Sequence, residues 1–137
     1  MIKDHESMKK SKKDKKLGKI MIVEDDLDQR EMLVLMLQKE GFETETAEDG
    51  TEFLNRLDTF NPDIVTLDVM MPGLTTWEIL KDLKDKKSKP KIILLTVVRY
   101  SEEEKKKIMT MGNIVDYIKK PFDLDDFMDA IKKHVPQ

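Results

Sequence analysis

The sequence predicts an α/β protein with a doubly wound, five-stranded parallel sheet of order 2-1-3-4-5. From Lys19 onward, short apolar runs alternate with helical patterns, and no repeat or low-complexity segment interrupts them, which is typical of βα units. Parallel neighbours need right-handed crossover connections, which the intervening helices provide. The 137 residues, 39% of them hydrophobic, are enough for one compact domain with a core but leave no room for a second.

The predicted strands differ in their apolar pattern. Residues 20–23 form an uninterrupted apolar run, as expected of a buried strand, whereas residues 42–47 alternate in polarity as an edge strand does. The remaining strands are predicted at 63–68, 92–95 and 114–118.

The predicted helices are recognised by apolar faces and by start and stop signals. The first places Leu33, Met36 and Leu37 on one face and stops before Gly41. In the last, Leu124, Phe127, Ile131 and Val135 recur at helical spacing and should dock on the sheet. The helices are predicted at about 27–39, 49–57, 75–86, 101–112 and 123–135.

Three helix starts carry capping signals. Thr75 with Glu78, and Ser101 with Glu104, have the spacing of capping boxes. We interpret Asp26 as the N-cap of the first helix, with Gln29 at the reciprocal position.

The charge divides the chain into a basic arm and an acidic body. Residues 1–19 hold eight lysines against three acids, which leaves 17 basic and 25 acidic residues in 20–137. No aromatic residue is interleaved among the arm's lysines to stack on bases, so we expect a flexible arm over 1–18 and no direct nucleic-acid partner. The folded domain is expected over 19–137.

Several function classes are excluded by composition. The chain has no cysteine, and its two histidines, His5 and His134, lie near opposite ends, so thiolate zinc sites and Ser-His-Asp triads are poorly supported. The longest apolar run, 32–37, falls far short of the ~18 residues of a membrane-spanning helix. Without a secretory signal pattern, we expect a cytoplasmic protein with no membrane insertion.

Acidic residues follow two strands that the predicted order makes neighbours. Strand 20–23 runs into Glu24, Asp25 and Asp26, and strand 63–68 ends in Asp68. Carboxyl ends of parallel strands meet at one edge of the sheet, so these carboxylates should converge there. Such carboxylates stay ionised only if a cation shares the site, and hard oxygen ligands suit Mg²⁺.

The chemistry of such a site points to phosphoryl transfer. Thr96 follows strand 92–95, and strand 114–118 runs into Lys119, Lys120 and Pro121, which brings a hydroxyl and an ammonium to the same edge. No GxxxxGK[ST] or GxGxxG loop is present to cradle a nucleotide. A carboxylate can itself attack phosphorus and form an acyl phosphate, while Mg²⁺ and a lysine neutralise the transferring group.

At these residues the chain resembles the receiver domain of two-component response regulators, a flavodoxin-like fold. The resemblance covers about residues 19–135 and rests on four blocks in order, each at the carboxyl end of a predicted strand. The blocks are Ile-Val-Glu-Asp-Asp at 22–26 with Arg30, Pro-Asp-Ile-Val-Thr-Leu-Asp-Val-Met-Met-Pro-Gly at 62–73, Ile-Leu-Leu-Thr at 93–96 and Asp-Tyr-Ile-Lys-Lys-Pro-Phe at 116–122.

The resemblance implies roles for the residues at the acidic edge. Asp68 would be the phospho-acceptor, and Asp25, Asp68 and the backbone carbonyl of Met70 would bind Mg²⁺ directly. Glu24 would hold a metal-bound water. Lys120 would contact the phosphoryl group, and the peptide between Lys120 and Pro121 would be cis.

The resemblance also implies a switch. The Thr96 hydroxyl would move to a phosphoryl oxygen and the Tyr117 ring would turn inward behind it; the alternative is that Tyr117 is only an ordinary core residue. The changed surface would comprise helix 101–112, strand 114–118 and helix 123–135. Implied partners are a sensor histidine kinase or phosphotransfer protein and an unknown downstream protein target.

Two features of the sequence bear on this switch, and the first is a departure from the family pattern. The stretch 112–115 is one residue longer than usual, which bears on the shape of the output surface. In receivers, the residues two after the acceptor and two after the switch threonine flank the path of the hydrolytic water. Here they are Met70 and Val98.

Two other function classes stay open. A receiver-like adaptor that works without phosphorylation would lack the acceptor or the lysine, and both are present. A phosphatase with an aspartate nucleophile usually needs a second acid two residues on, where this chain has Met70. We therefore expect a stand-alone, single-domain regulator whose only catalysis is its own phosphorylation and dephosphorylation.

Overall fold

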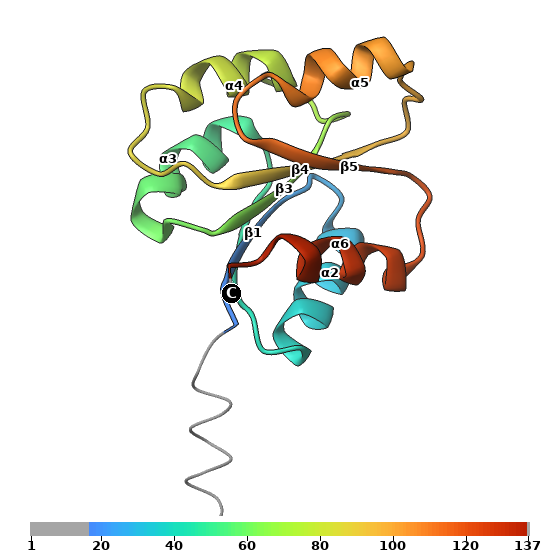
Figure 1. Cartoon of the computed structure of the whole chain (residues 1–137). Helices are drawn as coiled ribbons and strands as arrows, with labels where there is room; N and C mark the ends of the chain where they lie inside the picture. The colour runs from blue at the N-terminus through green and yellow to red at the C-terminus, as the bar shows by residue number, and fades with distance from the viewer. Residues whose placement is uncertain (1–16, 137) are drawn as a thin grey trace, which may run out of the picture.

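The computed structural model describes residues 17–136. They fold into an alternating series of strands and helices (Figure 1). In chain order these are β1 (Lys19–Val23), α2 (Leu27–Lys39), β2 (Glu43–Ala47), α3 (Gly50–Phe60), β3 (Ile64–Asp68), α4 (Thr76–Leu83), β4 (Lys91–Thr96), α5 (Glu102–Met109), β5 (Ile114–Lys119) and α6 (Leu124–His134).

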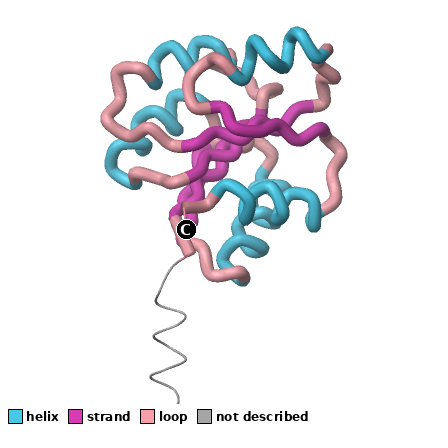
Figure 2. Tube along the Cα trace, viewed as in Figure 1, coloured by secondary structure: helices cyan, strands magenta, loops and turns pink. Residues whose placement is uncertain are grey.

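The strands form one parallel sheet of order β2-β1-β3-β4-β5, which confirms the predicted fold class. Helices α3, α4 and α5 cover one face, and α2 and α6 cover the other (Figures 1 and 2). The chain reverses its winding between β1 and β3. The carboxyl ends of these two central strands therefore lie side by side, where a doubly wound sheet collects its functional groups.

Each face of the sheet has its own hydrophobic core. On the α3–α5 side, Phe53 and Leu57 of α3 and Ile79 of α4 are fully buried against the strands. On the other side, Leu33 and Leu37 of α2 meet residues of α6. The apolar runs 20–23 of β1 and 92–95 of β4 follow from this, because their side chains alternate between two dry layers.

The helix starts agree with the capping signals except in one detail. Both predicted capping boxes, at Thr75 and Ser101, are present. Asp26 caps α2 by accepting from the Gln29 amide at 2.9 Å. The Asp26 amide, however, donates to the Glu24 carboxylate at 3.1 Å, so no reciprocal bond from Gln29 closes a capping box.

Several boundaries differ from the sequence prediction. Helix α3 continues to Phe60 and ends where Asn61 adopts a left-handed conformation (φ 51°). Helix α4 stops at Leu83, and residues 84–86 continue in tighter turns whose amides bond three residues back. Helix α5 ends at Met109, short of Gly112. Leu124 was expected to dock on the sheet but is exposed, because it is the first residue of α6 and faces outward.

Strand β5 contains an extra residue. Ile92 of β4 pairs with Ile114, but the next residue, Ile93, pairs with Asp116, so Val115 is a bulge. Strand β5 thus holds one residue more than its pairing with β4 uses. After the bulge the Asp116 carboxylate contacts Nε2 of His134 at 3.1 Å, which links the edge strand to the end of α6.

The predicted arm lies almost wholly outside the described residues. Of residues 1–18, only Leu17 and Gly18 are described, and both bond to the body: Leu17 donates to the Gly41 carbonyl and Gly18 accepts from the Glu43 amide. Within residues 17–136, none of the helices is both long and apolar enough to cross a bilayer.

Candidate functional site

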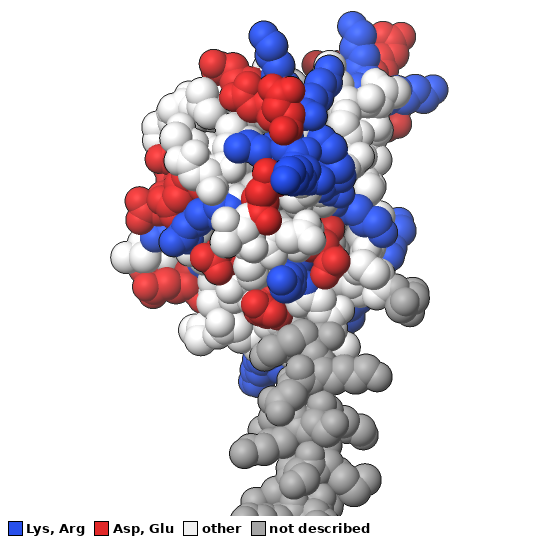
Figure 3. Space-filling view, turned by 90° about the vertical axis from the view of Figure 1, so that its left-hand side faces the viewer, with Lys and Arg blue, Asp and Glu red and all other residues white. Residues whose placement is uncertain are grey.

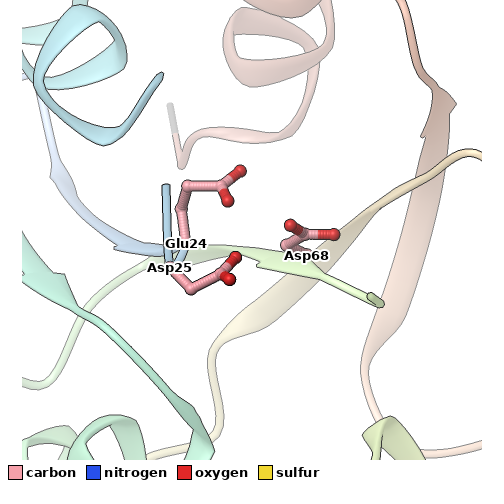
Figure 4. Close-up of side chains that lie close together, drawn as sticks. All are labelled: Glu24, Asp25 and Asp68. Atoms are coloured by element: carbon pink, nitrogen blue, oxygen red, sulfur yellow. The ribbon is translucent and has the colours of Figure 1, made fainter. Parts of the chain in front are cut away.

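Three carboxylates converge at the carboxyl edge of the sheet (Figure 4). Glu24 and Asp25 follow β1 directly, and Asp68 is the last residue of β3. One oxygen from each lies within 4.8 Å of the others. Glu24 and Asp68 are only 1% and 5% exposed, whereas Asp25 is open to solvent. The cluster is thus half embedded, with one side accessible to an incoming group.

Lys120 reaches this cluster from the far edge of the sheet. Its ammonium donates to Glu24 Oε1 at 3.0 Å and to Asp68 Oδ2 at 3.2 Å. The backbone holds it there, since the Lys120 amide donates to the Thr96 carbonyl at 2.7 Å. The peptide between Lys120 and Pro121 is cis, as expected. A strand end two strands away therefore supplies the cation that partly balances the acids.

The site still carries an excess of negative charge. Burial, together with the neighbouring Asp68 carboxylate, raises the pKa of Glu24 to about 7, although bonds from the Asp26 amide and Lys120 oppose the shift. Burial lowers the pKa of Lys120, but the bonds and charges of Glu24 and Asp68 outweigh it, so this pKa is raised. Lys120 stays charged, and a further cation would favour the ionised form of Glu24.

Asp68 is fixed by the loop that follows it. Its Oδ1 accepts from the Met70 amide at 3.0 Å, and the Val69 amide donates to the Leu95 carbonyl of β4. The Met70 side chain is 61% exposed and points away from the core. Its backbone, rather than its side chain, is the part of Met70 held at the site.

Thr96 and Tyr117, the two predicted switch residues, lie in the neighbouring strands β4 and β5 and have different contact partners. Thr96 is buried at the end of β4, and its hydroxyl accepts from the Val98 amide at 2.9 Å. Tyr117 is half-buried in β5, packed edge-on against Tyr100, with the Lys105 ammonium 5.0 Å from its ring centre. Tyr117 therefore contacts Tyr100 in the loop before α5 and Lys105 of α5 itself.

Arg30 is a site-supporting residue to which the sequence analysis assigned no role. Its guanidinium is nearly buried and donates to the carbonyl of Glu24 at 2.8 Å and that of Asp25 at 3.4 Å. Its second nitrogen lies 3.5 Å from Glu48. The helical spacing from the acidic run was a usable signal, because a residue one turn into α2 can reach back under the loop.

The donor set fits a hard divalent cation. It consists of three carboxylates with no cysteine or histidine among them, and the pKa of one of them, Glu24, is raised by burial and by the neighbouring Asp68. Oxygen-only ligands with an open side suit Mg²⁺, which keeps several of its waters.

A doubly wound sheet with such an acid cluster and a lysine at its carboxyl edge defines a class of Mg²⁺-assisted phosphoryl-accepting domains. The response regulator receiver domain family matches residues 20–132. The chain is 34% identical over 118 residues to sporulation initiation phosphotransferase F of Bacillus subtilis, covering 86% of this chain and 94% of that protein.

Other relatives are longer. The sensory transduction protein RegX3 of Mycobacterium tuberculosis is 33% identical over 113 residues, which cover 82% of this chain but 48% of RegX3. The chain thus spans about half the length of some relatives and nearly all of others.

Solved structures of response regulators have the same fold as this chain. The chemotaxis response regulator CheY4 of Vibrio cholerae aligns with a TM-score of 0.77 and 28% identity over 86% of this chain and 98% of that one. The response regulator TrrA of Thermotoga maritima, in complex with Mg²⁺ and BeF, aligns with a TM-score of 0.69 and 36% identity. The match covers 85% of this chain and 98% of TrrA. The chain belongs to the response regulator receiver domains, and it is a phosphorylation-dependent signalling switch of the two-component type.

Proposed function

We propose that Asp68 accepts a phosphoryl group from the phosphohistidine of a sensor kinase or phosphotransfer protein. One observation carries the assignment. Asp68 is held on both oxygens, by the Met70 amide on Oδ1 and by the Lys120 ammonium on Oδ2. Glu24 is held on both oxygens as well, but it follows β1, whereas Asp68 ends β3 next to β4, whose last residue is Thr96. A nucleophile fixed in this way loses little orientational freedom when it reacts.

The transfer exchanges one bond for another. A carboxylate oxygen of Asp68 attacks phosphorus and forms an acyl phosphate, while the bond from phosphorus to the donor's imidazole nitrogen breaks. The nitrogen keeps the electron pair and takes up a proton. Lys120 stays beside Asp68 and offsets the charge of the phosphoryl oxygens.

We propose that Mg²⁺ is held by Asp25, Asp68 and the Met70 carbonyl directly, and by Glu24 through water. When bound, the ion neutralises charge on the phosphoryl oxygens. This fits their burial: Glu24 is buried and anchored by the Asp26 amide and Lys120, whereas Asp25 is exposed to solvent.

The proposed output is a change of the surface formed by α5, β5 and α6. Thr96 would turn its hydroxyl from the Val98 amide to a phosphoryl oxygen, and Tyr117 would move inward. Because Tyr117 packs on Tyr100 and Lys105, its movement would shift α5. The downstream target is a protein; direct nucleic-acid binding is not part of the proposal.

The proposal also covers the domain organisation of the chain, its cellular location and its lack of a separate substrate. Residues 1–18 are a basic arm, 19–137 are the receiver domain, and the protein is cytoplasmic. It acts on no separate substrate, since the position that would protonate a leaving group in a phosphatase is Met70.

The test is intact-mass measurement after incubation with a small phosphodonor. We expect one phosphoryl group per chain with Mg²⁺ present, none in chelator, and none in Asp68→Asn. The control Asp85→Asn, an exposed aspartate of the α4–β4 loop, should be labelled like the natural protein. Labelling that persists in Asp68→Asn or in chelator would overturn the assignment.

A further inference from the structure

A recess lies between α4 and the turn that follows α5. Both elements belong to the α3–α5 side of the molecule (Figure 1). Its volume is about 440 Å³, and its apolar walls include Trp77 and Leu80 of α4 and Met111 beyond α5. Trp77, the only tryptophan of the chain, is 47% exposed and Met111 is 42% exposed. Adjacent exposed tryptophan and methionine are typical of interaction sites, where such residues are enriched.

A smaller notch of about 80 Å³ adjoins this recess and shares Leu80, Lys84 and Gly112 with it. Leu83 and Ile92 are buried beneath it. Engineered cavities of ~150 Å³ accept benzene, so this notch has room for the end of one aliphatic side chain. Gly112, which lines both spaces, has a left-handed conformation (φ 61°) that favours glycine.

The rim of the recess is positively charged. Lys81 of α4 and Lys84, which follows the end of α4, are both exposed and line the recess. Among the ion pairs of residues 17–136, none involves either lysine. Lys89 differs, because its ammonium donates to the carbonyls of Leu83 and Lys84 at the end of α4.

The segment from Lys81 to Lys91, which runs from the end of α4 through the loop that follows to the start of β4, is rich in lysine. Residues 81–91 contain six lysines and two aspartates, although residues 20–137 as a whole are acidic. Figure 3 shows lysine and arginine side chains gathered together on the face that carries α3 and the α4–β4 loop. An apolar recess with unpaired cations at its edge is complementary to a segment that combines apolar and acidic side chains.

We propose that this recess docks an acidic, apolar segment of a partner protein. One large aliphatic side chain enters the notch beside Leu80, neighbouring apolar groups cover Trp77 and Met111, and carboxylates pair with Lys81 and Lys84. A nucleic-acid strand fits less well, since the recess offers one aromatic ring and a notch too narrow for a base. The proposal goes beyond phosphorylation at Asp68 and does not depend on it.

Trp77 provides the reporter for the test. The probe is a short synthetic amphipathic peptide with leucines at helical spacing and glutamates on the flanks. We expect it to shift Trp77 emission to shorter wavelength, with affinity falling as salt rises. A scrambled peptide of the same composition, a peptide with lysine in place of glutamate, and single-stranded oligothymidylate should each bind at least tenfold more weakly.

Charge-reversal variants locate the contact. Lys81→Glu combined with Lys84→Glu should weaken peptide binding at least tenfold, and so should Met111→Asp, which places a carboxylate on the apolar wall. These positions are exposed, so the far-UV circular dichroism should not change. The matched control, Lys132→Glu with Lys133→Glu, reverses two exposed lysines of α6 and should leave binding unchanged.

Three outcomes would overturn the proposal. Equal binding of the scrambled peptide would show that the recess recognises charge alone. Oligothymidylate binding tighter than the acidic peptide would assign the surface to nucleic acid. Self-association of the natural protein that the Lys81→Glu, Lys84→Glu variant abolishes would assign it to a second copy of the chain.

Discussion

Glu24 is 1% exposed, and its pKa is raised to about 7 by burial and by Asp68, from the usual 4.5. Between pH 4.5 and 7 the folded, metal-free protein therefore keeps a proton on Glu24 that the unfolded chain has released. Because the folded state binds more protons in this window, its stability falls as pH rises.

The expected loss is on the order of 3 kcal/mol at most, from 1.36 kcal/mol for each unit of pKa difference. Glu24→Gln removes the titrating group and should flatten the profile between pH 4.5 and 7. Urea unfolding in chelator at a series of pH values measures this. Glu31→Gln, an exposed change on α2, is the control, and an unchanged slope in Glu24→Gln would contradict the account.

Arg30 holds the acidic loop from beneath through the carbonyls of Glu24 and Asp25. Arg30→Met should lower the free energy of unfolding by about 2 kcal/mol, because it leaves a buried carbonyl without its donor. It should also weaken Mg²⁺ binding, since the Asp25 peptide is no longer fixed. Arg30→Lys should not restore either property, because one ammonium lacks the planar fork of a guanidinium.

The control for Arg30 is Arg56→Met. Arg56 is half-exposed and pairs with Glu45 and Glu52 at 3.5 and 3.7 Å, and exposed ion pairs contribute about 0–1 kcal/mol. Urea unfolding and a metal titration compare the two variants. Equal losses of stability at both positions would mean that Arg30 is an ordinary surface arginine.

At the scale of the elements, α5 is the most weakly anchored helix. Ile108 is its only buried residue, whereas α3 buries five. Its other link to the sheet is Lys105 above the Tyr117 ring. An element with few buried apolar contacts opens and shifts at low cost, and this one is attached to the proposed switch residue.

Amide hydrogen exchange should therefore detect the switch in α5 and its neighbours. With Mg²⁺ and beryllium fluoride as a phosphoryl mimic, we expect changed exchange concentrated at about 96–122, and none of this change in Asp68→Asn. Helix α2 is anchored by Leu33, Leu37 and Arg30 and should respond little. A response confined to α2 would refute the α5, β5 and α6 surface as the output.

At the scale of the whole molecule, the carboxyl edge of the sheet assembles one site from loops far apart in the sequence. The loops after β3 and β4 bring Met70 and Val98 to this edge, each with its amide bonded to a site residue, Asp68 or Thr96. Neither side chain can hold a water by a strong hydrogen bond. Hydrolysis of an acyl phosphate on Asp68 should therefore be slow for this family.

The test compares the natural protein with Met70→Asn combined with Val98→Glu. If positioning the water contributes about 1.4 kcal/mol, the polar variant should lose its phosphate about tenfold faster. The apolar control Met70→Leu with Val98→Ile should keep the natural lifetime. Decay of the phosphorylated protein is followed by intact mass without kinase or phosphatase. Equal lifetimes of the natural and polar forms would show that Met70 and Val98 do not slow hydrolysis.

Local patterns in the sequence were sufficient to predict the sheet, its order, the capping boxes at Thr75 and Ser101, and the meeting of Glu24, Asp25 and Asp68. These features depend on apolar periodicity and on residues close together in the chain. Because the strands are parallel, their carboxyl ends lie at one edge of the sheet, whatever the conformation of the loops between them. The same reasoning predicted the lysine at that edge.

Only the tertiary structure decided features that depend on contacts between distant segments. Leu124 is exposed although its spacing is helical, because it is the first residue of α6 and faces outward. The Asp26 amide bonds to Glu24 instead of Gln29 because the buried carboxylate competes for it. Arg30 under the acidic loop and the unpaired Lys81 and Lys84 beside Trp77 follow from packing across elements. A periodic pattern specifies which face of an element is apolar, but which partner each polar group finds is set by the folded chain as a whole.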